Sequence, residues 1–386
     1  FIGNHASSIN AYGGAIYNGG TIGDITGDFI GNHADKGGAI YNYRYKAHAT
    51  IGNITGAFIG NHADKGGAIY NGEELSATNT TIGNISGDFI GNYADNSGGA
   101  IYNGGTIGDI SGDFIGNYAS SDGYLNGGAI YNYGNEKSVR IGNITGDFIG
   151  NYSGHAGGAI NNYGIASFAT IGDITGDFIG NYIESTSADS VEGGAIYNEG
   201  TIGNICGDFL NNYVKNSPSS GADFVSGGAV YTNRNLTFTT GGKEHFFSGN
   251  YTKDKRGKIY NGIFVENNYY SKYGPTFDTT GGGAWIINDN IDGGVRIISN
   301  ISYAYTRQYT LTFKGDGVLN EDGLTDQYIS INNDIINAGE VAVDGTTLRF
   351  GAYQHEDQTA KNWDGHGAFV NGVDGRDPVT SLSLNN

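Results

Sequence analysis

The sequence has few of the residues that cross-link small secreted domains or that bind nucleic acid. Its 386 residues include one cysteine, Cys206, three prolines, two tryptophans and no methionine. A single cysteine excludes an internal disulfide framework, so packing must stabilise the fold. Only 20 residues are basic, against 39 acidic ones, which gives a formal net charge of −19. We therefore expect no nucleic acid partner, because phosphate binding needs clustered lysine and arginine.

Long apolar runs are also missing from the sequence. No run approaches the roughly 18 residues that a membrane-spanning helix needs, so we expect no direct membrane insertion of this chain. The chain opens with Phe1 and has neither a starting methionine nor a basic and apolar leader. We therefore expect it to be a piece of a longer gene product.

Glycine is abundant, with 69 residues. Glycine at this level without a period is typical of disorder, but the 28 tyrosines and 18 phenylalanines supply apolar area that a disordered chain lacks. The glycines are in fact periodic. Three motifs recur in a fixed order with a period of 25 to 38 residues.

Each motif occurs at least six times, and some copies are variants. Phe-Ile-Gly-Asn begins at Phe1, Phe29, Phe58, Phe89, Phe114, Phe148 and Phe178, with variants at Phe209 and Phe247. Gly-Gly-Ala-Ile-Tyr-Asn begins at Gly13, Gly37, Gly66, Gly98, Gly127 and Gly193, with variants at Gly157 and Gly227. Ile-Gly-(Asp/Asn)-Ile-(Thr/Ser/Cys)-Gly begins at Ile22, Ile51, Ile82, Ile107, Ile141, Ile171 and Ile202.

The spacings between motifs separate fixed corners from variable loops. The distance from the Ile motif to the next Phe motif is always 7 residues, whereas the distance from the Phe motif to the Gly-Gly motif varies from 8 to 18. Short segments rich in Ile, Phe, Tyr and Thr, bounded by Gly and Asn, are typical of strands between turns. We predict an all-β fold, a right-handed parallel β-helix of about 13 coils with three strands in each repeat.

Two parts of this β-helix differ in regularity. Residues 1–262 contain the regular three-strand repeats, and residues 263–386 are expected to form irregular coils of the same β-helix. In the regular part, each motif position lies above its equivalent in the next coil, at about 4.8 Å. We therefore predict interior columns of Ile and Phe, and two columns of Asn linked by side-chain hydrogen bonds.

The tyrosine of the Gly-Gly motif forms another predicted column. If the preceding Ile points inward, alternation along the strand points this tyrosine outward. An exposed strip of aromatic rings is a candidate ligand surface, formed by Tyr41, Tyr70, Tyr102 and Tyr131. The alternative is that these rings stack on one another and shield the sheet.

Titratable residues also recur at fixed positions. Asp28, Asp88, Asp113, Asp147, Asp177 and Asp208 form one column, and His5, His33 and His62 begin another that continues as tyrosine. We expect each Asp to cap N–H groups of a turn, with Ca²⁺ bridging successive coils as the alternative. For the histidines, ring stacking is preferred over a metal site.

Cys206 replaces Thr or Ser of the Ile motif and is expected to be a tolerated small residue. We predict no catalytic residue, no cofactor and no metal ligand.

The paired tetrapeptides Gly-Gly-Ala-Ile and Phe-x-x-Asn, as at 37–40 and 29–32, resemble the repeats of the chlamydial polymorphic outer membrane proteins and similar autotransporter passengers. The segment 334–351 is similar to the passenger stem of type V secretion. This resemblance implies a secreted surface protein of a Gram-negative bacterium, attached through a barrel that is not in this fragment. It also implies adhesion, autoaggregation or biofilm formation.

We therefore predict a non-enzymatic adhesin whose partner is a protein or glycan on a host or neighbouring cell. One alternative is a self-associating extracellular filament unit, because the end of a β-helix presents unpaired strand edges. A second alternative is a polysaccharide-active enzyme. It rests on Asp364-Gly-His366-Gly, which resembles an element of polygalacturonases but lacks partner motifs for paired carboxylates.

Overall fold

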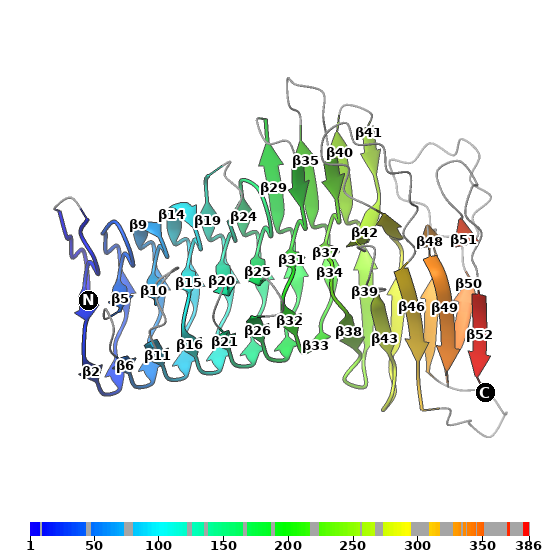
Figure 1. Cartoon of the computed structure of the whole chain (residues 1–386), viewed down its shortest axis with the longest axis horizontal. Coiled ribbons are helices and arrows are strands. Elements are labelled where there is room, and N and C mark those ends of the chain that lie inside the picture. Colours follow the sequence, from blue (N-terminus) through cyan, green and yellow to red (C-terminus); the bar gives the residue numbers. More distant parts are fainter. Residues whose placement is uncertain are drawn as a thin grey trace.

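The computed structural model describes most of the chain. The described residues are 1–7, 10–43, 48–72, 80–121, 126–134, 138–164, 168–186, 190–216, 224–254, 257–266, 273–294, 309–316, 327–332, 335–336, 338–344, 346–350, 369–370 and 381–385. They form a parallel β-helix in which the chain advances along one long axis from the N-terminal to the C-terminal end (Figure 1). This confirms the predicted all-β solenoid; its handedness stays a prediction.

Four parallel sheets form the wall of the β-helix, and we number them in the order in which the chain visits them. Sheet 1 contains the Gly-Gly motifs in β1 (Ile16–Asn18), β5 (Ile40–Asn42), β10 (Ile69–Asn71), β15 (Ile101–Asn103), β20 (Ile130–Gly134), β25 (Ile160–Gly164), β31 (Ile196–Asn198), β37 (Val230–Thr232), β42 (Asn261–Glu266), β45 (Asn290–Gly294), β48 (Ile335–Ile336) and β51 (Phe369–Val370). Sheet 2 contains β2 (Thr21–Ile22), β6 (Ala49–Ile51), β11 (Thr80–Ile82), β16 (Thr106–Ile107), β21 (Val139–Ile141), β26 (Ala169–Ile171) and β32 (Thr201–Ile202).

After sheet 2, the chain passes through sheet 3 and then sheet 4. The fixed distance of seven residues from the Ile motif to the Phe motif spans both steps. Sheet 3 contains β3 (Ile25–Thr26), β7 (Ile54–Thr55), β12 (Ile85–Ser86), β17 (Ile110–Ser111), β22 (Ile144–Thr145), β27 (Ile174–Thr175), β33 (Asn204–Cys206), β38 (Leu236–Thr239), β43 (Pro275–Asp278), β46 (Tyr309–Lys314), β49 (Ala338–Asp344) and β52 (Ser381–Asn385). Sheet 4 contains β4 (Phe29–Ile30), β8 (Phe58–Ile59), β13 (Phe89–Ile90), β18 (Phe114–Ile115), β23 (Phe148–Ile149), β28 (Phe178–Ile179), β34 (Phe209–Leu210), β39 (Glu244–Ser248), β44 (Ala284–Ile287), β47 (Tyr328–Ile331) and β50 (Thr347–Phe350).

A fifth sheet, the outer sheet, projects from this wall along the upper edge of Figure 1. It contains β9 (His62–Lys65), β14 (Tyr93–Ser97), β19 (Tyr118–Ala119), β24 (Tyr152–Ser153), β29 (Tyr182–Ser185), β35 (Tyr213–Asn216), β40 (Tyr251–Asp254) and β41 (Gly257–Ile259). A small parallel pair, β30 (Ser190–Glu192) and β36 (Phe224–Ser226), lies between the outer sheet and sheet 1 in sequence. Strand β41 pairs antiparallel with β40, so a hairpin covers that edge of the outer sheet.

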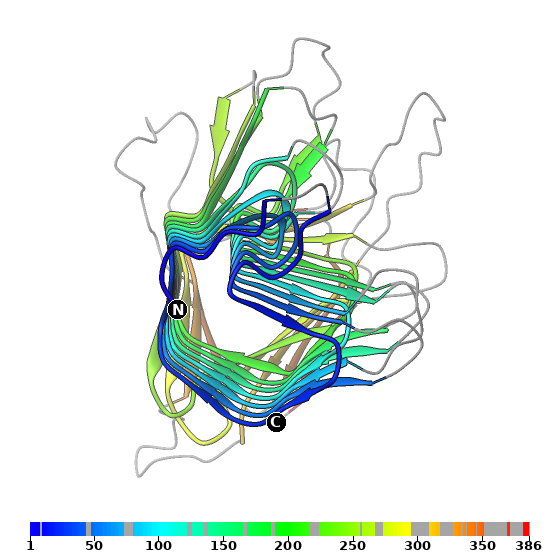
Figure 2. The same cartoon turned by 90° about the vertical axis from the view of Figure 1, so that its left-hand side faces the viewer.

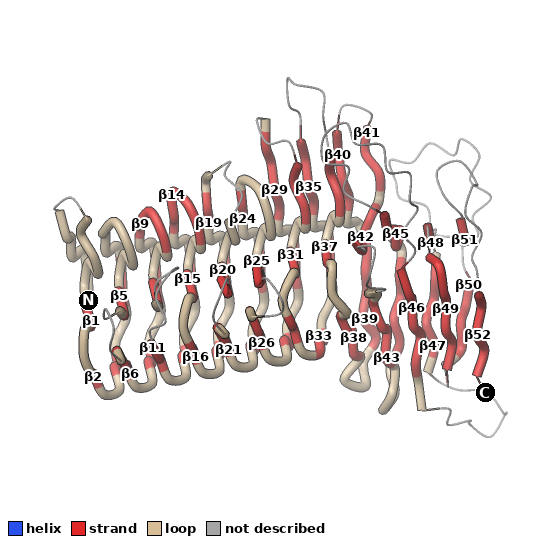
Figure 3. Tube along the Cα trace, in the orientation of Figure 1, coloured by secondary structure: helices blue, strands red, loops and turns tan. Residues whose placement is uncertain are grey.

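The coil therefore differs in detail from the predicted three-strand repeat. A middle coil has five strands, for example β10, β11, β12, β13 and β14, and many of them are only two residues long (Figure 3). The prediction of three strands was wrong, because tight corners divide each motif into shorter strands. In the described residues, sheets 1 and 3 each contain 12 strands, close to the expected 13 coils, and sheets 1, 3 and 4 continue past residue 262.

Figure 2 shows the wall in a view along the axis. The hydrophobic core lies inside this wall. The predicted columns of Ile and Phe lie there, and almost all of their members are fully buried. Phenylalanine rings stack from Phe1 through Phe247, with centroids 4.5 to 4.8 Å apart and nearly parallel planes. The in-register pairing of equivalent residues produces this spacing, because it equals the distance between neighbouring strands.

The two predicted asparagine columns are continuous ladders of hydrogen bonds. In the first, each Nδ2 donates to Oδ1 of the equivalent residue in the next coil, from Asn4 to Asn250, over 2.7 to 3.0 Å. This ladder ends on the buried carboxylate of Asp289. The second ladder runs from Asn18 to Asn198 in the same way and ends on Thr232. Both ladders satisfy buried amides that have no access to water.

The paired glycines have two different roles at their corner. The first glycine has a positive φ, as at Gly98 with 66°, which only glycine adopts without strain. The second glycine has no room for a side chain, because a Cβ on Gly99 would lie 2.0 Å from the carbonyl oxygen of Gly128 in the next coil. The glycine pair therefore sets both the direction of the turn and the close approach of the coils.

Candidate functional site

The predicted ligand surface on the Gly-Gly tyrosines is not exposed. Tyr41, Tyr70, Tyr102 and Tyr131 point out of the main core, as alternation predicts, but their exposed fractions are only 0 to 1%. The expectation of an accessible aromatic strip was therefore wrong, and the alternative of stacked, shielded rings is correct: Tyr70 and Tyr102 stack with centroids 4.5 Å apart.

Residues next to the outer sheet cover these tyrosines. The ammonium groups of Lys36 and Lys65 lie 5.1 and 5.8 Å from the ring centroids of Tyr70 and Tyr102, within the range of cation–π attraction. Lys65 belongs to β9, and Lys36 bridges to it from the preceding coil. The segment between the Phe and Gly-Gly motifs therefore forms a second layer over sheet 1.

The outer sheet carries a different aromatic column that does reach the surface. It consists of nine stacked rings, which we call the ring ladder: His5, His33, His62, Tyr93, Tyr118, Tyr152, Tyr182, Tyr213 and Tyr251. Their centroids lie 4.5 to 5.1 Å apart, and all nine side chains are exposed or half-buried. The ring stacking expected for the histidines and tyrosines is thus observed, and Tyr251 extends the column by one ring.

Alternation within the outer sheet explains why the rings face solvent. From His33 onward, the residue after each ring is buried, as for Ala63, Ala94, Ile183 and Val214, so the next residue returns to the ring face. Those positions hold Asp35, Asp64, Asp95, Ser120, Glu184, Lys215 and Lys253, with Gly154 as an interruption. The exposed face of the outer sheet therefore combines a row of aromatic rings with a parallel row of polar and charged side chains.

Hydrogen bonds fix several of these rings in place. The hydroxyl of Tyr93 donates to Asp95 over 2.5 Å, and the hydroxyl of Tyr213 donates to Glu184 over 3.0 Å. Glu184 also pairs with Lys215 at 3.3 Å. Burial and the bond to Glu184 raise the pKa of Tyr213 above its ordinary value. These rings are therefore held in one orientation before any partner arrives.

The N-terminal end of the ring ladder combines histidines with carboxylates. His62 Nε2 lies 3.3 Å from Asp95. Burial, and then the neighbouring His62 and His5, lower the pKa of His33. Burial, and then Asp95 and Asp35, raise the pKa of Asp64. Burial and the like charges of neighbouring coils thus oppose the ionisation of His33 and of Asp64.

The aspartate column caps backbone N–H groups, as predicted. Each Asp Oδ1 accepts the backbone N–H of the equivalent residue in the next coil, over 2.8 to 2.9 Å from Asp28 to Asp208. A second column, at Asp24, Asn53, Asn84, Asp109, Asn143 and Asp173, is built in the same way. The alternative that Ca²⁺ bridges the coils stays a hypothesis.

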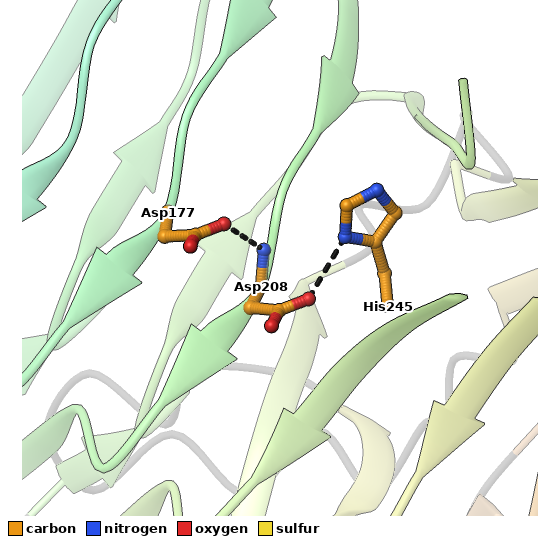
Figure 4. Close-up of side chains that lie close together, drawn as sticks. All are labelled: Asp177, Asp208 and His245. Carbon is orange, nitrogen blue, oxygen red and sulfur yellow. Dashed lines mark hydrogen bonds and ion pairs between the residues drawn. The ribbon is translucent and has the colours of Figure 1, made fainter. Parts of the chain in front are cut away.

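The aspartate column ends at a histidine that the repeat pattern does not predict. His245 approaches from the following coil, and its Nδ1 lies 2.8 Å from Oδ1 of Asp208 (Figure 4). Its Nε2 lies 3.1 Å from the carbonyl oxygen of Thr240 and 3.5 Å from Sγ of Cys206. The contacts with Asp208 and Cys206 raise the pKa of His245 to about 10. Cys206, expected to be a passive small residue, therefore borders a polar cluster.

Asp177 completes this cluster from the preceding coil. Ligand atoms of Asp177, Asp208 and His245 all lie within 4.8 Å of one another, and among the described residues this is the one group of three or more His, Cys, Asp or Glu side chains so arranged. His245 enters because residues 240–243 separate β38 from β39, whereas only residues 207 and 208 separate β33 from β34 in the preceding coil.

Two sequence features lie outside the described residues. They are the Asp364-Gly-His366-Gly segment behind the enzyme alternative, and the basic pair Lys255 and Arg256. Within the described part of the chain, no helix is long and apolar enough to cross a membrane.

Comparison with known proteins identifies the repeat. Residues 27–43 and 86–104 match the family model of the Chlamydia polymorphic membrane protein repeat. Each matched stretch contains a Phe motif with the Gly-Gly motif that follows it, the same pair that builds sheet 4, the outer sheet and sheet 1. No curated protein and no solved structure matches the chain. Two segments of the chain therefore match the Chlamydia polymorphic membrane protein repeat, and this match suggests a surface protein of an autotransporter-like kind.

Proposed function

We propose that this chain is the adhesive segment of an extracellular bacterial surface protein. In this proposal the ring ladder of the outer sheet contacts a protein or glycan on a host or neighbouring cell, without catalysis. The main support is the continuous column of nine exposed or half-buried rings, together with two segments that match the repeat of a family of surface proteins. Attachment to a Gram-negative outer membrane would come from a part beyond this chain.

Two physical features favour the ring ladder as a contact surface. Amphipathic aromatic side chains are enriched at interfaces, because they bury a large area and lose little conformational entropy. Stacking and hydrogen bonds already fix rings such as Tyr93 and Tyr213, so binding orders few additional rotamers.

The stacking also limits how a ligand can approach the rings. Four of the eight neighbouring pairs are stacked face to face, with an interplanar angle of only 5° between Tyr213 and Tyr251, and the other four are tilted. The outward surface therefore offers ring edges and hydroxyl groups, flanked by Asp95, Glu184 and Lys215. A partner that supplies hydrogen-bond donors and acceptors at intervals of one coil, about 4.8 Å, fits this surface best.

Substitution of three central rings tests the proposal. Tyr118→Ser, Tyr152→Ser and Tyr182→Ser together keep a hydroxyl at each position but remove the ring. We expect this variant to lose at least about tenfold in binding to cultured cells, which corresponds to roughly 1.4 kcal/mol.

The matched control lies on sheet 3 of the same three coils. Ser111, Thr145 and Thr175 are exposed there, and their replacement by Ala leaves the ring ladder intact. Circular dichroism must show that both variants fold. Equal binding by the wild-type chain and the ring variant would refute the assignment of this surface.

A further inference from the structure

The end of the aspartate column brings together side chains that the proposed function does not use. Asp177, Asp208 and His245 come from three successive coils (Figure 4): the two aspartates lie at the corner between sheets 3 and 4, and His245 lies in β39 of sheet 4. The side chain of His245 is 10% exposed and that of Asp208 is 22% exposed, so solvent reaches the carboxylate more easily than the imidazole.

The surroundings of the imidazole determine which nitrogen carries a proton. The carbonyl oxygen of Thr240, 3.1 Å from Nε2, only accepts hydrogen bonds, so Nε2 must donate. Nδ1 of a neutral ring then has a lone pair that faces Oδ1 of Asp208 at 2.8 Å. Two acceptors at this distance repel each other, so a proton or a metal ion must lie between them.

A divalent cation would neutralise more of the negative charge in this cluster than a single proton does. With a neutral imidazole, the two carboxylates carry two negative charges, which a divalent ion balances. Each Oδ1 already accepts a backbone N–H, from Asp208 and from Phe246, while Oδ2 of Asp177 and of Asp208 has no hydrogen-bond partner among the described residues. The donation from Nε2 to a carbonyl is also the usual way in which proteins orient a metal-binding histidine.

We propose that Asp177, Asp208 and His245 form a binding site for a divalent transition metal of the Zn²⁺ type. One nitrogen and two oxygen ligands with an open fourth position suit Zn²⁺, whereas Ca²⁺ prefers six to eight oxygens. Ligand atoms of a tetrahedral zinc site lie about 3.3 Å apart. Metal binding would therefore lengthen the 2.8 Å distance between Nδ1 of His245 and Oδ1 of Asp208. It would also bring the other ligand atoms, which lie within 4.8 Å of one another, to about the same spacing.

A metal bound at this site would cross-link three successive coils at the point where the regular repeat changes. Up to Asp208, the corner between sheets 3 and 4 has a fixed length, and from residue 240 it contains an insertion. Cys206 lies on the Nε2 side of the ring, away from the metal position, and so acts as a neighbour rather than a ligand.

Titration of the chelator-treated and desalted chain tests the site. Isothermal titration calorimetry with Zn²⁺ should give a stoichiometry of one, and the melting temperature should rise with Zn²⁺ but not with Ca²⁺. We expect Asp177→Asn and His245→Ala each to weaken binding at least about tenfold. Asp147→Asn is the matched control, because it holds the same column position one coil farther from His245, and it should leave the affinity unchanged.

Binding of Co²⁺ to the wild-type chain gives a second readout that requires no variant to fold. The proposal predicts visible absorption bands of a tetrahedral site without a thiolate charge-transfer band. A thiolate band would overturn the ligand assignment, and full binding by His245→Ala would place the metal elsewhere, for example at His33 and His62. Absence of Zn²⁺ binding would show that a proton alone bridges His245 and Asp208, which also overturns the proposal.

Discussion

Truncation of one buried rung of the first asparagine ladder should destabilise the whole β-helix. Asn117 has no exposed surface. Its Nδ2 donates to Oδ1 of Asn151 and to the carbonyl of Phe89, and its Oδ1 accepts both the backbone N–H and the Nδ2 of Asn92. The substitution Asn117→Ala removes all four of these hydrogen bonds.

The size of the effect follows from what the neighbours lose. The backbone N–H of Asn92 keeps no other partner, and a buried orphan costs about 1–3 kcal/mol. The Nδ2 of Asn92 still donates to Phe58, and Oδ1 of Asn151 still accepts the N–H of Asn117. Each of the other three bonds contributes about 0.5–1.5 kcal/mol, so we expect a total loss near 5 kcal/mol.

A matched rung on the surface provides the comparison. Asn84 makes the same kind of contact, because its Oδ1 accepts the N–H of Asp109 over 2.9 Å, but it is exposed. Water can replace that contact, so Asn84→Ala should cost only about 0.5 kcal/mol. Equilibrium urea unfolding, followed by fluorescence and circular dichroism, measures both variants, and coincident transitions are required. A loss of similar size in the two variants would refute the reasoning that burial makes the ladder costly to break.

The corner glycines and the histidines of the ring ladder give two further predictions. Gly99→Ala should lower the free energy of unfolding by more than about 4 kcal/mol or prevent folding, because its Cβ would lie 2.0 Å from a carbonyl oxygen. Gly91 has a φ of 58° and open space around it, so Gly91→Ala should lower the free energy of unfolding by only about 1 kcal/mol. Similar thermal stability of these two variants would contradict this explanation. Folding lowers the pKa of His33, so the unfolded state binds more protons as the pH falls below 6.5; stability is complete above that pH and decreases below it. His33→Tyr, the residue type of the later coils, should remove part of this acid-side loss in urea unfolding between pH 7 and pH 5, and an unchanged pH dependence would show that His33 is not responsible.

The sequence predicted the columns correctly because equivalent motif positions repeat in register. Phe89 lies above Phe58, and Asn92 donates to Asn117, as the motif spacing requires. In-register stacking follows from repetition alone and needs no knowledge of the corners. The number of strands in each coil was harder to predict, because two-residue strands between glycine corners have no periodicity of their own.

The candidate surface could be predicted only in part. Tyr70 points out of the main core, as alternation requires, but its burial depends on a second layer that begins at residues such as His62. The distance from the Phe motif to the Gly-Gly motif varies, which is typical of loops. For this reason the sequence did not indicate that an outer strand begins at the same position after each Phe motif. A signal was present, because an aromatic residue follows the Phe motif in every coil from His33 to Tyr251.

The cluster at His245 had no signal in the repeat. It depends on an insertion before Phe247, and an insertion changes which residue occupies the corner. The aspartate column ended at Asp208 in the sequence, but only the folded corner shows which side chain lies beyond it. Contacts made by irregular coils therefore need the structure.

Chemical nitration of tyrosine in the free and cell-bound chain would show which surface the partner covers. Tyr118 on the ring ladder is 37% exposed, Tyr17 is 57% exposed but lies on sheet 1, and Tyr70 is buried. In the free chain, Tyr118 and Tyr17 should react and Tyr70 should not. On binding to target cells, the proposed adhesive role of the ring ladder predicts protection of Tyr118 while Tyr17 stays reactive. Equal reactivity of Tyr118 in the free and bound chain would contradict it.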